Sequence, residues 1–221
     1  MTTTIQDAMP ELMEALGQTL WMSSWAFVLT IIFGMASGVL LRLTSPDGLT
    51  PNKIVYGGFG ALINLGRSLP FLILLIALIP VTRLIVGSAI GPTAAIVPLT
   101  VGAVPFYARV VESALREVDP GKIEAAIVMG SDTKAIVRKV LIPESMPGLV
   151  SGATLTLVTL IGYSTMAGVI GGGGVGDFAI RYGYQRFDAA VTLVAVVILI
   201  IIVQAVQTAG DAIVRGMNHK R

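Results

Sequence analysis

The sequence predicts an all-α integral membrane protein, one domain over residues 1–221 with five transmembrane helices and a helical cytoplasmic loop. Hydrophobic residues make up 54% of the chain and charged residues only 13%, whereas soluble domains carry about 25% charged residues. Several apolar runs have a length of about 20 residues, which is enough for a helix to cross a bilayer core. A charged island, residues 112–147, lies between two of these runs. The chain has no cysteine, which excludes disulfides and thiolate metal sites.

The first span is predicted over about 20–41, an uncharged run that ends at Arg42. The preceding segment is acidic and carries no Lys or Arg, whereas a cleaved signal peptide begins with basic residues. We therefore expect a retained helix. The polar loop that follows, 42–53, has turn residues at its centre.

The limits of the second span admit two interpretations. Residues 54–82 would measure about 43 Å as one helix, too long for one span without strong tilt, and Arg67-Ser68-Leu69-Pro70 interrupts them. Either the part before the interruption lies along the interface and only the rest spans, or one kinked helix does both. The prediction adopted is a span over about 60–82, with Arg67 in its cytoplasmic half.

The remaining spans are predicted over about 92–111, 148–170 and 189–210. Two pairs of glycines spaced four apart, Gly34/Gly38 and Gly148/Gly152, permit close contact between helices. They are short and common patterns, so they predict contact without identifying the partner helix.

The distribution of Lys and Arg predicts the orientation. With the island inside, the inner segments hold eleven of the fifteen basic residues and the outer segments three, with Arg67 unassigned. We therefore expect the amino terminus outside and the carboxyl terminus in the cytoplasm. The eleven are Arg42, Lys53, Arg109, Arg116, Lys122, Lys134, Arg138, Lys139, Arg215, Lys220 and Arg221, and the three are Arg83, Arg181 and Arg186.

The island carries start and stop signals for two short helices. Asp119-Pro120 suits a helix start, because Asp accepts a backbone N–H bond and Pro lacks a donor where none is needed. Gly130 suits the left-handed end of that helix. Residues 131–132 can cap a second helix, which Pro143 should stop. The island is thus predicted as a cytoplasmic loop of two helices over 112–147.

The first of these helices can serve either of two purposes. Ala125 and Ala126 give a face thin enough to enter a cleft, with Ile123 and Ile127 adding apolar area and Glu124 a charge. Alternatively, the loop lies on the lipid surface, attracted by its basic residues. Physical reasoning alone gives the two readings equal weight.

A family signature distinguishes them. Glu124-Ala125-Ala126, then Gly130, then a segment ending in Pro143, resembles the conserved motif of the inner-membrane subunits of binding-protein-dependent ABC importers. Val140 and Ile142 are mild departures from it. Further stretches look like the permease of methionine ABC importers: Arg67–Phe71, Ile96–Ala103, the glycine run from Gly171, and Ala209-Gly210-Asp211.

The resemblance implies a multi-pass permease of the bacterial inner membrane. It implies a homodimer of five-helix subunits surrounded by lipid, two cytoplasmic ATPase subunits, and an external, usually lipid-anchored, binding protein that delivers D- or L-methionine. The helix at 120–130 would be the coupling helix, seated in the ATPase. No phosphate-binding G-x-x-x-x-G-K-[ST] loop occurs here, so the partner would bind ATP and Mg and this chain would be no enzyme. Nothing points to nucleic acid.

Other classes of protein remain as alternatives. A permease for another amino acid or an osmoprotectant is the closest. An ion-coupled secondary transporter would show intramembrane charges and inverted repeats, and the spans carry almost no charge. A membrane enzyme would need a catalytic constellation, and a metal site would need clustered His, Asp or Glu; neither pattern is present in the sequence.

Two candidate sites lie outside the island. In the fourth predicted span, Thr156, Thr159, Tyr163 and Met166 share one helical face; they line either a translocation path or a helix–helix contact.

The glycine run 171–176 satisfies G-x-G-x-x-G, but a membrane span precedes it instead of a strand, which argues against a dinucleotide site. We expect a flexible or tightly turned outer loop. By family position, Asp177, Arg181 and Arg186 would contact the binding protein. At the inner end of the third span, Arg109 and Glu112 are spaced to form an ion pair.

Overall fold

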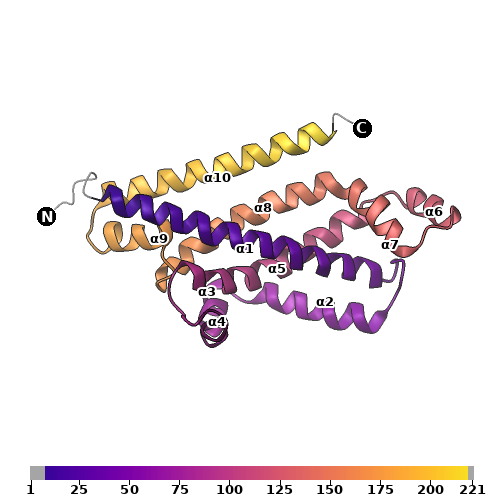
Figure 1. The fold of residues 1–221 in the computed structure, drawn as a ribbon, viewed down its shortest axis with the longest axis horizontal. Coiled ribbons are helices and arrows are strands. Elements are labelled where there is room, and N and C mark those ends of the chain that lie inside the picture. The colour runs from indigo at the N-terminus through magenta and orange to yellow at the C-terminus, as the bar shows by residue number, and fades with distance from the viewer. Residues whose placement is uncertain (1–7, 219–221) are drawn as a thin grey trace.

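A computed structural model describes residues 8–218, and these residues form an elongated bundle of helices (Figure 1). Its elements in order are α1 (Met9–Thr44), α2 (Lys53–Ser68), α3 (Phe71–Ala77), α4 (Ile79–Val86), α5 (Pro92–Arg116), α6 (Pro120–Val128), α7 (Thr133–Ile136), the π-helical turn η1 (Val137–Leu141), α8 (Ile142–Val169), α9 (Gly174–Phe178), the π-helical turn η2 (Ala179–Tyr184) and α10 (Ala189–Asn218).

The centre of the bundle is the pair α1 and α5, which lie along each other. They can approach closely because α1 presents glycines: a Cβ on Gly34 would lie 2.8 Å from Tyr107 Cδ1, and one on Gly38 would lie 2.5 Å from Val111 Cβ. Without side chains at these positions, the rings and branched chains of α5 pack against backbone. The predicted contact at Gly34/Gly38 is therefore confirmed, and its partner is α5.

Helix α8 packs against α5 by the same device. A Cβ on Gly148 would lie 3.2 Å from Ala114 Cβ, and one on Gly152 would clash with Val110. The buried core beside this contact joins α5 to the far end of the bundle and contains Tyr107, Val111, Leu115, Ile123, Ala126, Ile136, Leu141 and Leu149.

Four helices within residues 8–218 are long and apolar enough to cross a membrane: α1, α5, the continuous run Thr133–Val169, and α10. Helix α1 has 36 residues and so measures about 54 Å, well beyond the about 30 Å of a bilayer core. It begins eleven residues before the apolar run from which its span was predicted. Those first turns carry acidic residues and extend beyond the predicted span.

The segment expected as one span over 60–82 is broken in the structure. Helices α2 and α3 meet at 105°, and Leu78 separates α3 from α4. The cause of the first break is Pro70, which has no N–H and pushes Leu69 into the extended conformation, φ −80° and ψ 128°. The α2–α3 pair counts as a fifth candidate span only if its two arms are taken together.

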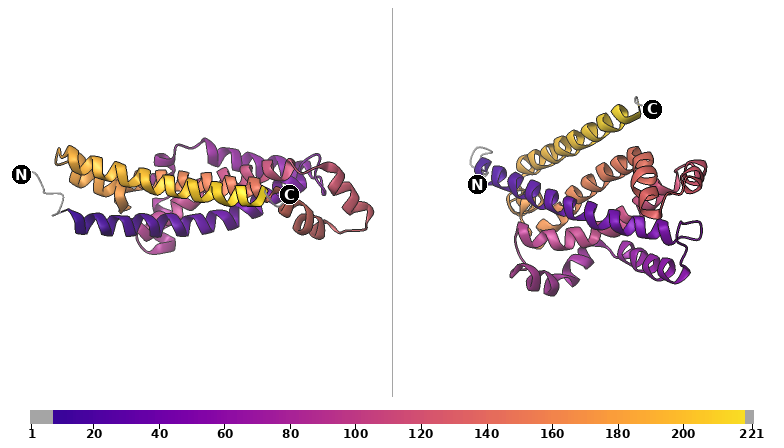
Figure 2. Two further views of the ribbon diagram at one scale, coloured as in Figure 1. Left: turned by 90° about the horizontal axis from the view of Figure 1, so that it is seen from above. Right: turned by 45° about the vertical axis from the view of Figure 1, so that its right-hand side comes forward.

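Helix α10 lies along the edge of the bundle (Figure 2), and it still packs against α8 at Gly210, near its carboxyl end, where an added Cβ would clash with Thr154. Its contacts are mainly with α8 and η2, and only 11% of its most apolar 18-residue window is buried within this subunit. A helix this apolar and this exposed has an extensive face available to lipid or to another subunit.

Candidate coupling site

Helix α6 forms as its capping residues predict. Asp119 accepts a hydrogen bond from the Gly121 N–H at 2.8 Å, with Pro120 as the first helical residue. At the other end Gly130 has φ +77°. The Ser131 N–H donates to the Ala126 carbonyl at 3.0 Å and the Gly130 N–H to the Ile127 carbonyl at 2.9 Å, the bond pair of a Schellman motif.

The second predicted helix is not a separate one. Asp132 caps α7 by accepting from the Ala135 N–H at 2.8 Å, but the chain stays helical through η1 into α8, and Pro143 does not stop it. The π-helical turn over 137–141 precedes Pro143 and changes the hydrogen-bonding register there. The predicted loop 112–147 is therefore shorter than expected, with α5 reaching Arg116 before it.

Some residues of the predicted motif lie on the exposed face of α6 and others on its buried face. Glu124 and Ala125 are exposed, but Ala126 is buried at 3% exposure in the core with Ile123. The expectation that both alanines and both isoleucines face a partner is thus wrong for two of the four. Ala126 lets α6 sit close against Ile136 and Leu141, so it positions the helix.

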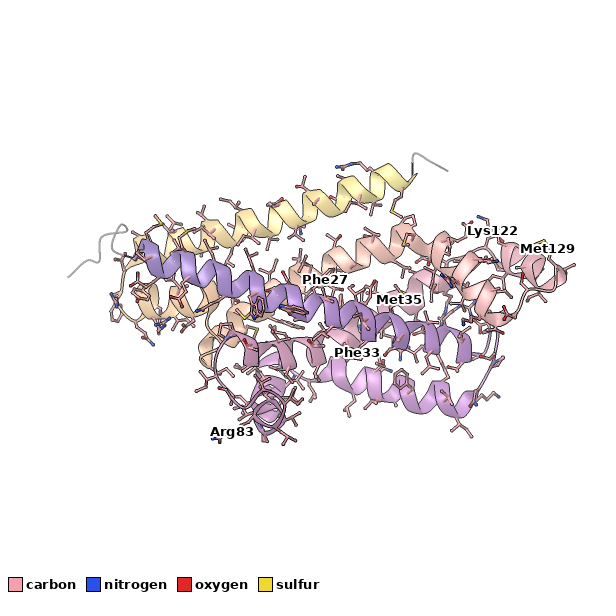
Figure 3. All side chains as sticks on the ribbon, in the orientation of Figure 1. Phe27, Phe33, Met35, Arg83, Lys122 and Met129 are labelled. Carbon is pink, nitrogen blue, oxygen red and sulfur yellow. The ribbon has the colours of Figure 1, made fainter. Side chains whose placement is uncertain are left out.

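The most prominent apolar residues of this end were not predicted. Val128 is 87% exposed and Met129 76%, beside Ile127 at 51%. Figure 3 shows Met129 at the tip of the molecule, beyond the ends of the long helices. Ile127 and Val128 follow the buried Ala126 by one and two residues, so the helical period alone would have placed them outward once Ala126 was known to be buried. Met129 lies three residues after Ala126, just beyond the last residue of the helix, and the period does not predict its exposure.

The last part of the motif, Val140 to Pro143, lies next to the core that holds α6. Val140 and Ile142 are partly buried against the same core, while Pro143 is exposed. Lys122 Nζ lies 2.6 Å from Glu144 Oε2 and so joins α6 to α8. A groove of about 350 Å³ runs between α6 and the α1–α2 loop. Its walls include Glu124 and Ile127 on one side and Arg42, Leu43 and Asp47 on the other.

A buried ionic network holds α2 to α5 just before α6 begins. Glu112, 4% exposed, accepts from Arg109 at 2.6 Å, from Arg116 at 2.9 Å and from the Tyr56 hydroxyl at 3.0 Å. Arg109 also donates to the Gly60 carbonyl at 3.1 Å and to Asn64 Oδ1 at 2.9 Å. The expected Arg109–Glu112 pair is confirmed, and its buried carboxylate is satisfied by three donors, as a buried charge requires.

The four residues of the predicted path are not equally accessible. Thr156 is fully buried and donates to the Gly152 carbonyl at 2.7 Å. Thr159 donates to the Leu155 carbonyl at 2.8 Å, and Tyr163 is half-buried with its ring stacked on Phe71. Met166 is 37% exposed. The stripe therefore turns from the interior at Thr156 to the surface at Met166.

The end of the bundle opposite α6, which the sequence predicts to be the outer end, is tightly turned. Gly171, Gly173 and Gly174 all have positive φ, between +74° and +85°. The Gly174 N–H donates to Gln18 Oε1 at 2.8 Å and the Val175 N–H to the Thr19 hydroxyl at 2.9 Å, which fixes the turn to α1.

Of the charged residues beyond this turn, Arg181 and Arg186 are exposed, whereas the side chain of Asp177 is only 16% exposed. Arg181 pairs with Asp177 at 2.6 Å, and this hydrogen bond raises the pKa of Arg181. Arg186 lies 4.3 Å from the centre of the Tyr182 ring. Across residues 8–218 no three His, Asp or Glu side chains are grouped to hold a metal ion.

Comparison with known proteins decides the family. Residues 30–220 match the model of the family described as "Binding-protein-dependent transport system inner membrane component". This chain belongs to that family. It is 52% identical over 209 residues to the probable D-methionine transport system permease protein MetI of Vibrio cholerae, covering 95% of this chain and 93% of the relative. It is 49% identical to the methionine import system permease protein MetP of Bacillus subtilis, covering 95% of each.

Solved structures show that this inner-membrane component has the fold of an ABC importer permease. A structure of the MetNI methionine ABC transporter in an inward-facing conformation matches with a TM-score of 0.93 at 48% identity, over 95% of this chain and 97% of the other. An amino acid ABC transporter solved with histidines matches with a TM-score of 0.79 at 18% identity, over 97% and 98%. The second likeness, at so low an identity, concerns the fold alone.

Proposed function

We propose that this chain is the permease subunit of an ATP-driven methionine importer, without catalytic activity of its own. Two copies would form the path, and two cytoplasmic ATPase subunits would bind ATP and Mg and seat one α6 each. An external binding protein would deliver methionine to the end that carries Asp177, Arg181 and Arg186. The amino terminus would face outside and the carboxyl terminus the cytoplasm, as the distribution of basic residues predicts.

One observation carries this proposal: α6 projects an exposed apolar end from a buried, capped base. Val128 and Met129 expose 87% and 76% of their surfaces, while Ile123 and Ala126 anchor the helix in the core. An apolar projection rimmed by polar residues is typical of a protein contact. The substrate rests on likeness to methionine permeases along nearly their whole length.

ATP binding would act here by favouring one arrangement of the two subunits over another. The ATPases would draw the two α6 helices together, and the core that holds α6 against α5 and α8 would transmit that movement to the spanning helices. The proposed path uses Thr159, Tyr163 and Met166 at the accessible part of α8. Thr156, predicted with them, is buried and would contribute by packing.

The test is uptake by proteoliposomes that contain this chain with the ATPase and the binding protein of the proposed transporter. We expect uptake of labelled methionine that requires ATP and the binding protein. Uptake of proline or glycine betaine instead of methionine would contradict the substrate assignment. Uptake driven by an ion gradient without ATP would contradict the assignment to ATP-driven transporters.

The coupling joint is tested by Glu124→Arg on the exposed face of α6. Reversing this charge should reduce ATPase co-purification or ATP-driven uptake by about ten-fold, the effect expected of an interface side chain worth about 1.4 kcal/mol. Glu11→Arg reverses another exposed carboxylate, on α1, and is the matched control. Equal behaviour of the two variants would show that α6 is not the joint.

A further inference from the structure

A small pocket lies beside the break between α2 and α3, where it meets the proposed path at Tyr163 and where Arg67 is exposed. It has a volume of about 170 Å³ and is lined from four helices, with Arg67 of α2, Phe71 of α3, Gly102 and Phe106 of α5 and Tyr163 of α8 among its walls. Pockets for drug-sized ligands measure about 300–1,000 Å³. This one suits a smaller molecule, about the size of one amino acid.

Its cation, Arg67, has no partner among the residues that the structure describes. Arg67 forms no ion pair or hydrogen bond with any other residue of the described range 8–218, whereas Arg109, Arg116 and Arg181 are each paired. The pocket lies at mid-length of α5: Gly102 comes ten residues after its first residue and fourteen before its last, about 15 Å and 21 Å along the axis. An ionisable group among apolar spans is a functional-site candidate by default.

Groups with partial negative charge lie beside Arg67, at the carboxyl end of α2. Pro70 has no N–H, so the carbonyl of Gly66, four residues earlier, lacks its helical hydrogen-bond donor. Carbonyls at the end of a 16-residue helix also carry the negative end of its dipole, which favours a cation. The break therefore offers a guanidinium and unpaired carbonyls within one turn of helix, the two partners that a zwitterion requires.

The rest of the pocket is an aromatic wall. The rings of Phe71 and Tyr163 are stacked, with centroids 4.1 Å apart and planes within 4°. Phe71 can approach α5 closely because Gly102 has no side chain; a Cβ there would lie 3.1 Å from the Phe71 ring. A thioether sulfur makes favourable contacts with aromatic rings, so this wall suits an apolar, sulfur-containing side chain.

We propose that this pocket is a transient binding site for the transported amino acid. Arg67 holds the carboxylate, the carbonyl end of α2 holds the ammonium, and the Phe71–Tyr163 wall receives the thioether side chain. The inference rests on the proposed function for the identity of the substrate, and it assigns to this chain a selectivity of its own, separate from that of the binding protein.

The first test varies the ligand and leaves the protein intact. The full chain in phosphatidylcholine nanodiscs is titrated with labelled L-methionine and then with competitors that each lack one group. L-Methioninol lacks the carboxylate, 4-(methylthio)butanoate lacks the ammonium, and L-norleucine has a methylene in place of sulfur. Each of the first two should compete at least about ten-fold more weakly than methionine, since each loses a charge-assisted hydrogen bond. Norleucine should lose less. No saturable binding, or equal competition by all three, overturns the proposal.

The second test varies the protein. Arg67→Gln should lower methionine uptake in the reconstituted transporter at least about ten-fold, with ATPase association retained, and Arg67→Lys should keep part of the activity. Arg83→Gln removes an exposed arginine of α4, which Figure 3 shows pointing away from the bundle, and should behave as wild type. Equal uptake by Arg67→Gln and wild type, or an equal loss in both Gln variants, would contradict the proposal that this pocket binds the substrate.

The outcomes separate this inference from the proposed function. If the wild-type transporter carries no methionine, the substrate assignment fails. If the wild type carries methionine and Arg67→Gln carries it equally well, only the pocket fails. Binding that disappears when anionic lipid replaces phosphatidylcholine would show that Arg67 serves lipid phosphate, and this also overturns the proposal.

Discussion

The two ends of this molecule both turn the chain with a glycine of positive φ, but they use glycine for different physical reasons. At the coupling end, a Cβ on Gly130 would meet no atom within 4 Å, so the residue is needed only for its φ of +77°. At the outer end, Gly174 has φ +82° and also leaves room for Met22 and Thr19, 2.5 Å and 2.6 Å from where its Cβ would lie. Gly176 has an ordinary helical φ and is needed for space alone, against the Thr165 backbone.

The difference shows how each end is built. The outer turn is buried against α1 and α8, with Val175 fully buried and Phe178 2% exposed. The coupling end is a projection whose tip, Val128 and Met129, is open. A close-packed turn resists displacement because added atoms would meet neighbouring side chains at Gly174 and backbone at Gly176, whereas a projection can be seated in another protein. The outer end is therefore the fixed part of this subunit and α6 the part shaped for a partner.

The largest effect is expected where packing is closest. In Gly176→Val, the new side chain would collide with the Thr165 backbone of α8, which cannot move as a flexible side chain could. Overpacking of this kind costs about 1–3 kcal/mol or more, so the purified protein should unfold at a clearly lower temperature or fail to elute as a folded species. Thermal unfolding and size-exclusion chromatography in detergent measure it.

The control for that experiment is a glycine of α8, the helix that contains Thr165. Gly162→Val adds the same atoms at an exposed position where a Cβ meets nothing within 4 Å, so its unfolding temperature should match that of wild type. If the two valine variants unfold alike, the outer end is no more closely packed than an exposed helix face, and the contrast between the ends is lost.

A second, intermediate effect is expected at the exposed tip, and it should leave the fold unchanged. Replacing Val128 and Met129 together by Ser removes apolar surface that this subunit does not bury. If that surface is the centre of an interface, the loss should be about 2 kcal/mol, or about thirty-fold in affinity for the ATPase. Leu84→Ser, at a residue as exposed as Val128, 87% in each case, should leave ATPase co-purification unaffected. Undiminished co-purification by the double variant would place the contact elsewhere.

The same comparison explains how much the sequence could predict. Caps depend on one or two neighbouring residues, so Asp119, Pro120 and Gly130 sufficed to predict both limits of α6. The face that α6 buries depends on residues far along the chain. Ala126 is buried because Ile136 and Leu141 lie against it, and no local pattern could show this.

Prolines account for two differences from the predictions, for a shared reason. Pro70 lies within the span expected over about 60–82, but the chain bends by 105° there and the expected span becomes separate helices. Pro143 was expected to stop a helix, but the π-helical turn before it changes the hydrogen-bonding register and the helix continues. Whether a proline ends a helix thus depends on backbone hydrogen bonds that tertiary packing selects.

The smallest expected effect separates conformation from space directly. Gly130→Ala adds a methyl group to open space, so its cost is the left-handed conformation alone, about 1–2 kcal/mol for an ordinary L-residue. Gly130→Asn should cost less, because the Asn side chain tolerates that conformation. At Gly176 the order should reverse, with Asn worse than Ala, since there the size of the side chain decides. Unfolding temperatures of the four variants measure this, and the same order of Ala and Asn at both sites would show that one constraint, and not two, governs these glycines.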